Sequence, residues 1–336
     1  MSDMRYSRQI LFQGIGQEGQ KRIQNSHAAI IGMGALGSAS AEMLVRAGVG
    51  KLTIVDRDYV ELSNLHRQQL YTEKDAEENL PKVMAAKKRL EAINRDVVID
   101  AKLEEANPNT LESLLPVDVI IDGLDNFETR MMINDFAQKH QIPWIYGACV
   151  ASYGVSLSIL PGETPCLHCL MEEIPLNGEN CDTVGIISPA VQMVSTYQVA
   201  EALKILSGQK QHVRKTLISF DLWKNEFSQI NVRSLKKTEC PSCGIRPSYP
   251  FLKYENWGKA EVLCGRDAVQ IRPGQRHKIN LPALKERFEI VNENPYLIVL
   301  QLEGKRVVLF RDGRAIIHGE SDQKHARSLY QKYIGG

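Results

Sequence analysis

The stretch "AIIGMGALGS", residues 29–38, decides the fold. An apolar run ends in Gly32, Gly34 and Gly37, which are spaced as Gly-x-Gly-x-x-Gly. A strand, this turn and a following helix place free backbone N–H groups where they can bind phosphate. The pattern therefore predicts a nucleotide-binding strand–turn–helix unit, but the glycines alone suit NAD, FAD and ATP equally.

The neighbouring segments alternate between apolar runs and amphipathic runs. The expected strands cover 27–34, 51–56, 97–103, 118–125 and 142–150, and the expected helices cover 5–25, 35–48, 81–94, 127–141 and 189–208. Strands that alternate with helices favour a parallel sheet with helices on both faces. We expect an α/β fold with a doubly wound, Rossmann-like, mostly parallel sheet.

The last part of the chain differs in its expected elements and in its balance of charge. Short strands are expected at 268–272 and within 296–317, followed by a helix over 322–335. Residues 1–244 hold 25 basic and 30 acidic side chains, whereas 245–336 hold 16 and 10. We therefore expect two domains, 1–244 and a small C-terminal α+β domain at 245–336. The sequence leaves the role of the second domain open.

Composition excludes several classes of protein. The chain has 336 residues, of which 43% are hydrophobic and 24% charged, as in soluble globular proteins. No apolar run approaches the roughly 20 residues that span a bilayer. The first 25 residues resemble no signal peptide, so a cytoplasmic protein without a membrane partner is expected. Basic residues are dispersed without an aromatic platform, which argues against a nucleic-acid partner.

The residues after the second expected strand distinguish the nucleotides. Asp56 lies 19 positions after Gly37, where a carboxylate can bond ribose hydroxyls in either NAD or ATP. Asn64, Arg67 and Gln68 follow, and Lys82 opens the next helix. Hydride transfer has little use for extra cations, whereas splitting a triphosphate requires them. This segment therefore favours ATP over NAD.

The end of the fourth expected strand carries a second polar group. Asp122, Asp125 and Asn126 lie there, and Arg130 follows one helical turn later. Carboxylates are hard oxygen ligands of the kind that Mg²⁺ prefers. Because the carboxyl ends of parallel strands meet at one edge of a sheet, these residues and the cations above predict an ATP–Mg²⁺ site.

The seven cysteines include two Cys-x-x-Cys pairs. Cys166 and Cys169, together with Cys240 and Cys243, can place four thiolates tetrahedrally on one structural Zn²⁺; the alternative is a redox dithiol. Cys181 has no partner at metal-type spacing and lies in the stretch 172–188, which is expected to be a mobile loop. It is a candidate sulfur nucleophile, with an ordinary exposed cysteine as the alternative.

Several ordered motifs together resemble one family. They are "RYSRQ" (5–9), "GMGALGS" (32–38), "DRDYVELSNLHRQ" (56–68), "PKV" (81–83), "LDNFETR" (124–130) and the two cysteine pairs. Over about residues 5–244 the chain resembles the ThiF/MoeB family of adenylyltransferases, the bacterial relatives of ubiquitin-activating enzymes. One departure is Ala35, which stands where many relatives have a third glycine and remains compatible with a backbone contact to phosphate.

The resemblance implies roles for individual residues. Asp56 would hold the ribose, and Asn64, Arg67 and Lys82 would contact the phosphates. Asp125 would serve Mg²⁺ and adenylate formation. Arg8 would reach the phosphates bound by a neighbouring subunit, which implies a homodimer.

The resemblance also covers the cysteines. It assigns the two pairs to zinc, and "CDTVG", residues 181–185, is similar to the Cys-x-Thr-x-Gly of ThiF-type and sulfurtransferase-linked members. In that branch the cysteine that corresponds to Cys181 forms an acyl-disulfide with the sulfur carrier protein.

The function that the resemblance implies is ATP-dependent adenylylation of the C-terminal glycine of a small ubiquitin-like sulfur carrier protein ending in Gly-Gly. By the same resemblance the carrier would serve thiamine thiazole synthesis, with a persulfide donor such as a cysteine desulfurase. The alternative is a MoeB-type enzyme acting on the small subunit of molybdopterin synthase. An NAD-dependent oxidoreductase and a non-catalytic scaffold are further alternatives. The chain's own terminal Gly335-Gly336 is expected to be a helix stop and not a carrier tail.

Overall fold

The computed structural model describes residues 2–171, 184–253, 260–263, 267–272, 279, 284 and 287–334. The chain folds as two compact units. The first unit comprises Met1–Glu73 and Pro81–Tyr254, and the second comprises Lys74–Leu80 and Glu255–Gly336. The second unit therefore includes a short piece taken from the middle of the first.

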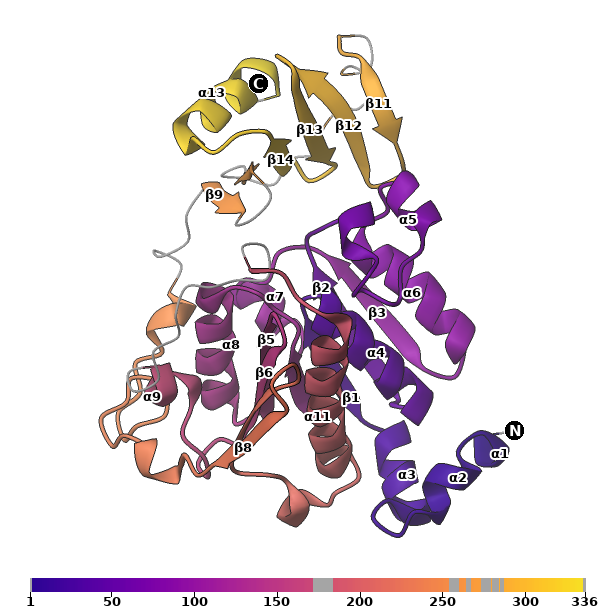
Figure 1. Ribbon diagram of the computed structural model, residues 1–336, viewed down its shortest axis with the longest axis vertical. Helices are drawn as coiled ribbons and strands as arrows, with labels where there is room; N and C mark the ends of the chain where they lie inside the picture. Colours follow the sequence, from indigo (N-terminus) through magenta and orange to yellow (C-terminus); the bar gives the residue numbers. More distant parts are fainter. Residues whose placement is uncertain are drawn as a thin grey trace. The chain divides into compact units, whose positions relative to one another are not determined.

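The first unit is built on an eight-stranded sheet with the order β3-β2-β1-β4-β5-β6-β7-β8 (Figure 1). The first five strands in this order pair in parallel, and β6, β7 and β8 are antiparallel. The strands are β1 (His27–Ile31), β2 (Lys51–Asp56), β3 (Val98–Leu103), β4 (Val119–Asp122), β5 (Trp144–Val150), β6 (Tyr153–Ile159), β7 (Leu217–Asp221) and β8 (Glu226–Ile230).

The central strands are apolar because helices cover them. All four residues of β4 are buried, as are the last four of β1. Continuous apolar runs of this kind are typical of parallel strands covered on both faces. The predicted doubly wound, mostly parallel sheet is confirmed. The antiparallel strands β6, β7 and β8 were not expected from the sequence.

Helices and short 3-10 turns connect the strands. They are α1 (Ser2–Arg5), α2 (Ser7–Leu11), α3 (Gly16–Gln24), α4 (Ala35–Ala47), η1 (Leu62–Asn64), α5 (Glu73–Glu77), α6 (Lys82–Ile93), α7 (Pro108–Glu112), α8 (Phe127–His140), α9 (Leu167–Met171), α11 (Ser188–Leu206), η2 (Lys210–His212), η3 (Arg233–Leu235) and η4 (Pro250–Leu252). Figure 1 shows α4 and α11 lying side by side against the sheet. The segment expected to be helical over 5–25 is divided among three short helices, and Gly16, at φ +61°, begins the third.

The order of the strands locates the crevice of the sheet. From β1 the chain proceeds outward to β2 and β3, and then returns to place β4 on the other side of β1. Ligands in doubly wound sheets bind at this reversal, beyond the carboxyl ends of the strands. The glycine turn after β1 and the loop after β4 both lie at this point.

The second unit contains a six-stranded antiparallel sheet with the order β11-β12-β13-β14-β10-β9. Its elements are β9 (Ala260–Leu263), β10 (Ala268–Ile271), β11 (Ile290–Glu293), β12 (Leu297–Leu302), β13 (Lys305–Phe310), β14 (Ala315–His318) and α13 (Gln323–Tyr333). Ala326, Leu329 and Tyr330 of α13 complete its apolar core. The small α+β character expected of the C-terminal part is confirmed.

The division of the chain differs from the boundary placed at 245. Residues 245–253 belong to the first unit, and backbone hydrogen bonds join them to it. Ile245 donates its N–H to the Thr238 carbonyl at 3.0 Å, and Phe251 donates to the Asp135 carboxylate at 2.8 Å. No helix in the described part of the chain is long and apolar enough to cross a membrane.

Candidate active site

The three glycines of the turn serve different purposes. A Cβ on Gly32, whose φ is +92°, would lie 2.5 Å from the Gly123 carbonyl oxygen. A Cβ on Gly37 would lie 1.8 Å from the Gly32 oxygen. Close backbone packing therefore explains these two. At Gly34 a Cβ would find its nearest neighbours, Gln68 Nε2 and the Gly123 oxygen, at 3.9 Å. Packing does not require that glycine, and the open space beside it lies where α4 begins at Ala35.

Asp56 joins the end of β2 to the glycine turn. One carboxylate oxygen accepts the Met33 N–H at 2.6 Å, and the other accepts the Asp58 N–H at 2.7 Å. The Tyr71 hydroxyl donates to the Met33 carbonyl at 2.6 Å. These bonds fix the turn and hold the Asp56 carboxylate beside the position that a ribose takes in this fold.

The segment after β2 buries two polar side chains. Asn64 and Gln68 are 4% and 3% exposed. Neither Asn64 Oδ1 nor Gln68 Oε1 meets a hydrogen-bond partner within the part of the chain that the structure describes. An unsatisfied buried acceptor costs about 1 to 3 kcal/mol, so a ligand or a water molecule that donates to these oxygens would stabilise the site. Arg67 is partly exposed and donates to the Ser63 carbonyl at 3.0 Å.

Lys82 opens α6 directly after Pro81. Its N–H donates to the Asp58 carbonyl at 2.9 Å, and its ammonium lies 3.1 Å from the Asp58 carboxylate. The Lys82 side chain is 4% exposed. Asp58, which the sequence did not single out, therefore holds this cation beside the end of β2.

The strand β4 ends in a buried ion pair. Arg130 Nε lies 2.9 Å from the Asp122 carboxylate, and Arg130 Nη2 donates to the carbonyls of Leu124 at 2.6 Å and Gly147 at 3.0 Å. Although burial opposes its charge, attraction to Asp122 raises the pKa of Arg130. Gln198 of α11 donates to the Asp122 carbonyl at 2.8 Å. Asp122 and Arg130, grouped with the phosphate-site charges in the sequence, instead fix the loop after β4.

That loop presents Asp125. Asp125 is exposed, and Asn126 caps α8 by accepting the Thr129 N–H at 3.0 Å. The Asn126 amide also donates to Asp125 at 3.4 Å. An exposed carboxylate on a loop held by Arg130 suits a hard cation such as Mg²⁺.

The predicted residues are brought together in part. Direct contacts join the glycine turn to Asp56 and to the loop after β4, and Gln68 Nε2 is among the atoms nearest Gly34. Arg8 is exposed on α2, and no described hydrogen bond or ion pair joins it to these groups. Cys181 lies outside the described residues. The structure also shows contributions from Asp58, Gly123 and Gln198, which the sequence did not single out.

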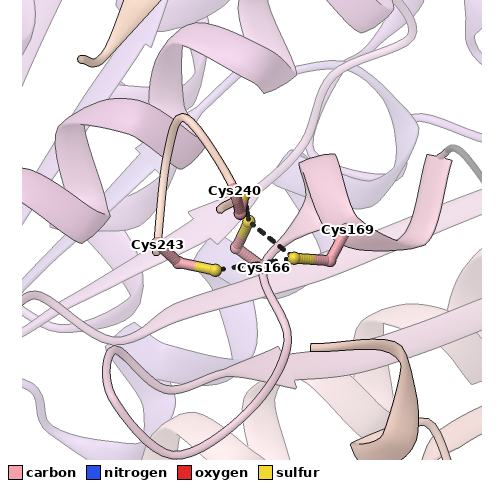
Figure 2. Close-up of side chains that lie close together, drawn as sticks. All are labelled: Cys166, Cys169, Cys240 and Cys243. Carbon is pink, nitrogen blue, oxygen red and sulfur yellow. Dashed lines mark hydrogen bonds between the residues drawn. The ribbon is translucent and has the colours of Figure 1, made fainter. Parts of the chain in front are cut away.

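The four paired cysteines form one cluster, shown in Figure 2. All four Sγ atoms lie within 4.8 Å of one another, with Cys166–Cys240 at 3.6 Å and Cys169–Cys243 at 3.5 Å. About 70 residues separate the two pairs in the sequence. The fold brings them together, with one pair at α9 and the other in the turn at 240–244. The set fits a tetrahedral ion ligated only by thiolates, which leaves no open position for catalysis.

The four thiols of the cluster differ in acidity. The hydrogen bond from Cys166 lowers the pKa of the Cys169 thiol to about 6, whereas hydrogen bonds within the cluster raise the pKa of the Cys166 thiol. The backbone N–H of Lys237 also donates to Cys169 Sγ at 3.5 Å. A Cβ on Gly244 would lie 2.5 Å from the carbonyl oxygens of Cys240 and Thr238, so only glycine fits this turn.

The chain is similar to known proteins along most of its length. The model of the ThiF family matches residues 6–242. The sulfur carrier protein ThiS adenylyltransferase of Bacillus subtilis is 52% identical over 98% of this chain and 99% of its own length. The protein of the same name from Escherichia coli is 35% identical over 72% of this chain and 95% of its own length.

The solved structures extend this likeness to the fold. A crystal structure of Escherichia coli MccB with ATP matches with a TM-score of 0.61 and 20% identity, over 71% of this chain and 74% of that one. The glycine turn, the polar loops after β2 and β4 and three of the four clustered cysteines lie within the segment matched by the family model. The chain belongs to the ThiF family.

Proposed function

We propose that this chain uses ATP to adenylylate the C-terminal glycine of a small ubiquitin-like sulfur carrier protein of the ThiS type, for thiamine thiazole synthesis. The observation that carries the proposal is the 52% identity to the Bacillus subtilis ThiS adenylyltransferase, which extends over both units. The open space at Gly34 and the unsatisfied oxygens of Asn64 and Gln68 support a nucleotide at the switch point of the sheet.

The reaction needs positioning and charge neutralisation more than proton transfer. The carrier's terminal carboxylate is ionised at neutral pH, so no general base is required. A carboxylate oxygen attacks the α-phosphorus of ATP, the bond from that phosphorus to the bridging oxygen breaks, and pyrophosphate leaves. The product is an acyl-adenylate, which is a good electrophile for sulfur. Preorganised cations lower the barrier by stabilising the charge that develops on the phosphates.

The site residues divide these tasks. Asp56 binds the ribose, and Asn64 and Gln68 offer amide groups to the nucleotide. Arg67 and Lys82 neutralise phosphate charge, with Asp58 holding Lys82 until ATP arrives. Asp125 would hold Mg²⁺, which would neutralise further charge on the phosphates. Arg8 of the partner subunit completes the cationic set in a homodimer.

Sulfur chemistry is a separate step. We assign it to Cys181, with a persulfide donor such as a cysteine desulfurase supplying the sulfur. The four clustered cysteines would hold a structural Zn²⁺, which would tie α9 to the turn at 240–244. We expect Cys181→Ala to retain ATP–pyrophosphate exchange and to lose sulfur transfer; loss of both activities would contradict this division.

Carrier-dependent ATP–pyrophosphate exchange tests the proposal. The chain is assayed with a ThiS-type carrier and with the small subunit of molybdopterin synthase. Faster exchange with the ThiS-type carrier supports the proposal, and preference for the other carrier would assign the chain to molybdenum cofactor synthesis. Absence of exchange with both would contradict adenylylation.

Asp125→Ala tests the assigned site. The variant should lose exchange while dimerisation and zinc content persist, because Asp125 is exposed and holds no part of the core. Retained exchange would remove Asp125 from the mechanism.

A further inference from the structure

The second unit contains one stretch of chain from the first half of the sequence. Lys74–Leu80 comprises most of α5 and the turn that follows it, and it belongs to the same compact unit as Glu255–Gly336. This stretch ends just before Pro81 and Lys82. The link matters because Lys82 is a proposed ATP ligand.

Side chains of the C-terminal segment bind the backbone at the end of α5. Asn292 Nδ2 donates to the Glu77 carbonyl at 2.8 Å. Asn294 Nδ2 donates to the carbonyls of Glu78 at 2.9 Å and Asn79 at 3.0 Å. The last carbonyls of a helix have no partner within the helix, so external donors are well matched to them.

The turn itself is held in one conformation. Asn79 has φ +50° and is 8% exposed, and its side-chain amide donates to the carbonyls of Ala76 and Glu77, each at 3.0 Å. Arg306 donates to Asn79 Oδ1 at 2.6 Å. The left-handed conformation suits asparagine better than most residues, and the guanidinium fixes its side chain.

The donor Asn294 is also fixed in place. Its Oδ1 accepts the N–H groups of Tyr296 at 2.9 Å and Leu297 at 3.1 Å. The orientation of the amide is therefore set within the second unit, and its two N–H groups are directed at the turn after α5.

The chain carries this constraint to the ATP site. From Asn79 the chain reaches Lys82 in three residues, which span at most about 10 Å. The Lys82 N–H is bonded to the Asp58 carbonyl at 2.9 Å, so the residue is fixed from both directions. Without the bonds to the turn, the start of α6 would be held only from the side of β2, by the contacts of Lys82 with Asp58 and of Pro81 with Tyr59.

We infer that Asn292, Asn294 and Arg306 are positioning residues for Lys82, so that the C-terminal unit sets the affinity of the site for ATP. The inference rests on the proposed function, in which Lys82 binds phosphate. It assigns a role to the second unit that needs no catalytic group within that unit.

Asn294→Asp is the most selective variant. It keeps the oxygens that accept the Tyr296 and Leu297 N–H groups, removes the two N–H donors and places a carboxylate against two carbonyls. Asn292→Asp makes the same change at the neighbouring bond. Glu303→Gln is the control, because Glu303 pairs with Lys332 and Tyr333 on the same unit and has no bond to Lys74–Leu80 among those described.

Two measurements on the full-length variants test the inference. Pyrophosphate exchange gives kcat and the KM for ATP and for the carrier, and amide hydrogen exchange reports on residues 78–83. We expect Asn294→Asp to raise the KM for ATP about tenfold, as for the loss of one or two hydrogen bonds, while the KM for the carrier is unchanged. Amide exchange at 78–83 should accelerate, and Glu303→Gln should match the parent chain. A purely structural role would lower the apparent kcat and leave the KM for ATP unchanged.

The outcomes separate the inference from the proposed function. Lys82→Ala is measured in parallel. If Lys82→Ala loses exchange and both asparagine variants keep the parent KM for ATP, the positioning role is overturned and the proposed function stands. If Lys82→Ala keeps full exchange, the role assigned to Lys82 and the inference are both contradicted. Carrier-dependent exchange by the parent chain would still support adenylylation.

Discussion

At the residue scale, the glycine turn distinguishes packing from ligand binding. Gly37 is needed because a Cβ would collide with the Gly32 oxygen, whereas Gly34 borders open space. We expect Gly37→Ala to destabilise the fold by on the order of 3 kcal/mol through overpacking. Gly34→Ala should lower the melting temperature far less and should raise the Kd for ATP. Thermal unfolding and ATP titration of both variants check this, and equal losses of stability would contradict it.

The buried ion pair after β4 gives a second prediction at this scale. Arg130→Met leaves the Asp122 carboxylate, which is 0% exposed, without its counter-charge. Breaking one side of such a pair costs about 3 to 5 kcal/mol. Lys139→Met on the same helix removes an exposed pair with Glu112, for which about 1 kcal/mol or less is expected. Urea unfolding of both variants measures the difference in the free energy of unfolding. Similar losses of stability would contradict a stabilising role for the Arg130–Asp122 pair.

At the scale of elements, the cysteine cluster joins α9 to the turn at 240–244. Metal that binds only the folded chain stabilises it by mass action, so chelation should lower the melting temperature by several degrees. Elemental analysis should give one zinc per chain in the parent protein and less in Cys240→Ser. An unchanged melting temperature after complete metal removal would contradict a structural role.

The connection between β14 and α13 predicts a dependence on pH. A hydrogen bond with His325 lowers the pKa of Glu320 from 4.5 to about 2. Because the folded-state pKa is lower than the unfolded one, the stabilisation is present above about pH 4.5 and is lost as the pH falls toward 2. The free energy of unfolding of the second unit should therefore fall as the pH is lowered from about 4.5 toward 2. Glu320→Gln should make this fall smaller. Denaturant unfolding at a series of pH values measures it.

Element prediction from the sequence succeeded where periodicity was strong. The parallel strands are apolar runs bounded by glycine and charged residues, and all of them were found. The antiparallel strands β6, β7 and β8 of the first unit were missed. For β8 the reason is that it is wholly exposed and has no apolar face to signal it, whereas β6 and β7 are mostly buried. One signal was available: Asn225, at φ +58°, lies between β7 and β8, and asparagine favours such turns.

At the scale of the whole molecule, the sequence predicted the fold class and the paired cysteines but not how the site is held together. Three tertiary contacts hold it, namely Asp58 with Lys82, Arg130 with Asp122, and Gln198 with Asp122. They join residues 8 to 76 positions apart, so no local spacing in the sequence predicts them. The same holds for Lys74–Leu80, whose place in the C-terminal unit depends on side chains more than 200 positions away.

The measurement that tests the central claim most directly is mass spectrometry of the carrier after incubation with this chain and ATP–Mg²⁺. The account predicts a carrier whose mass has risen by one adenylyl group (AMP less one water) at its C-terminal glycine. The product should not form when that glycine is deleted or when Lys82 is replaced by alanine. A carrier that remains unmodified, while the chain binds NAD in the crevice between β1 and β4, would contradict the account.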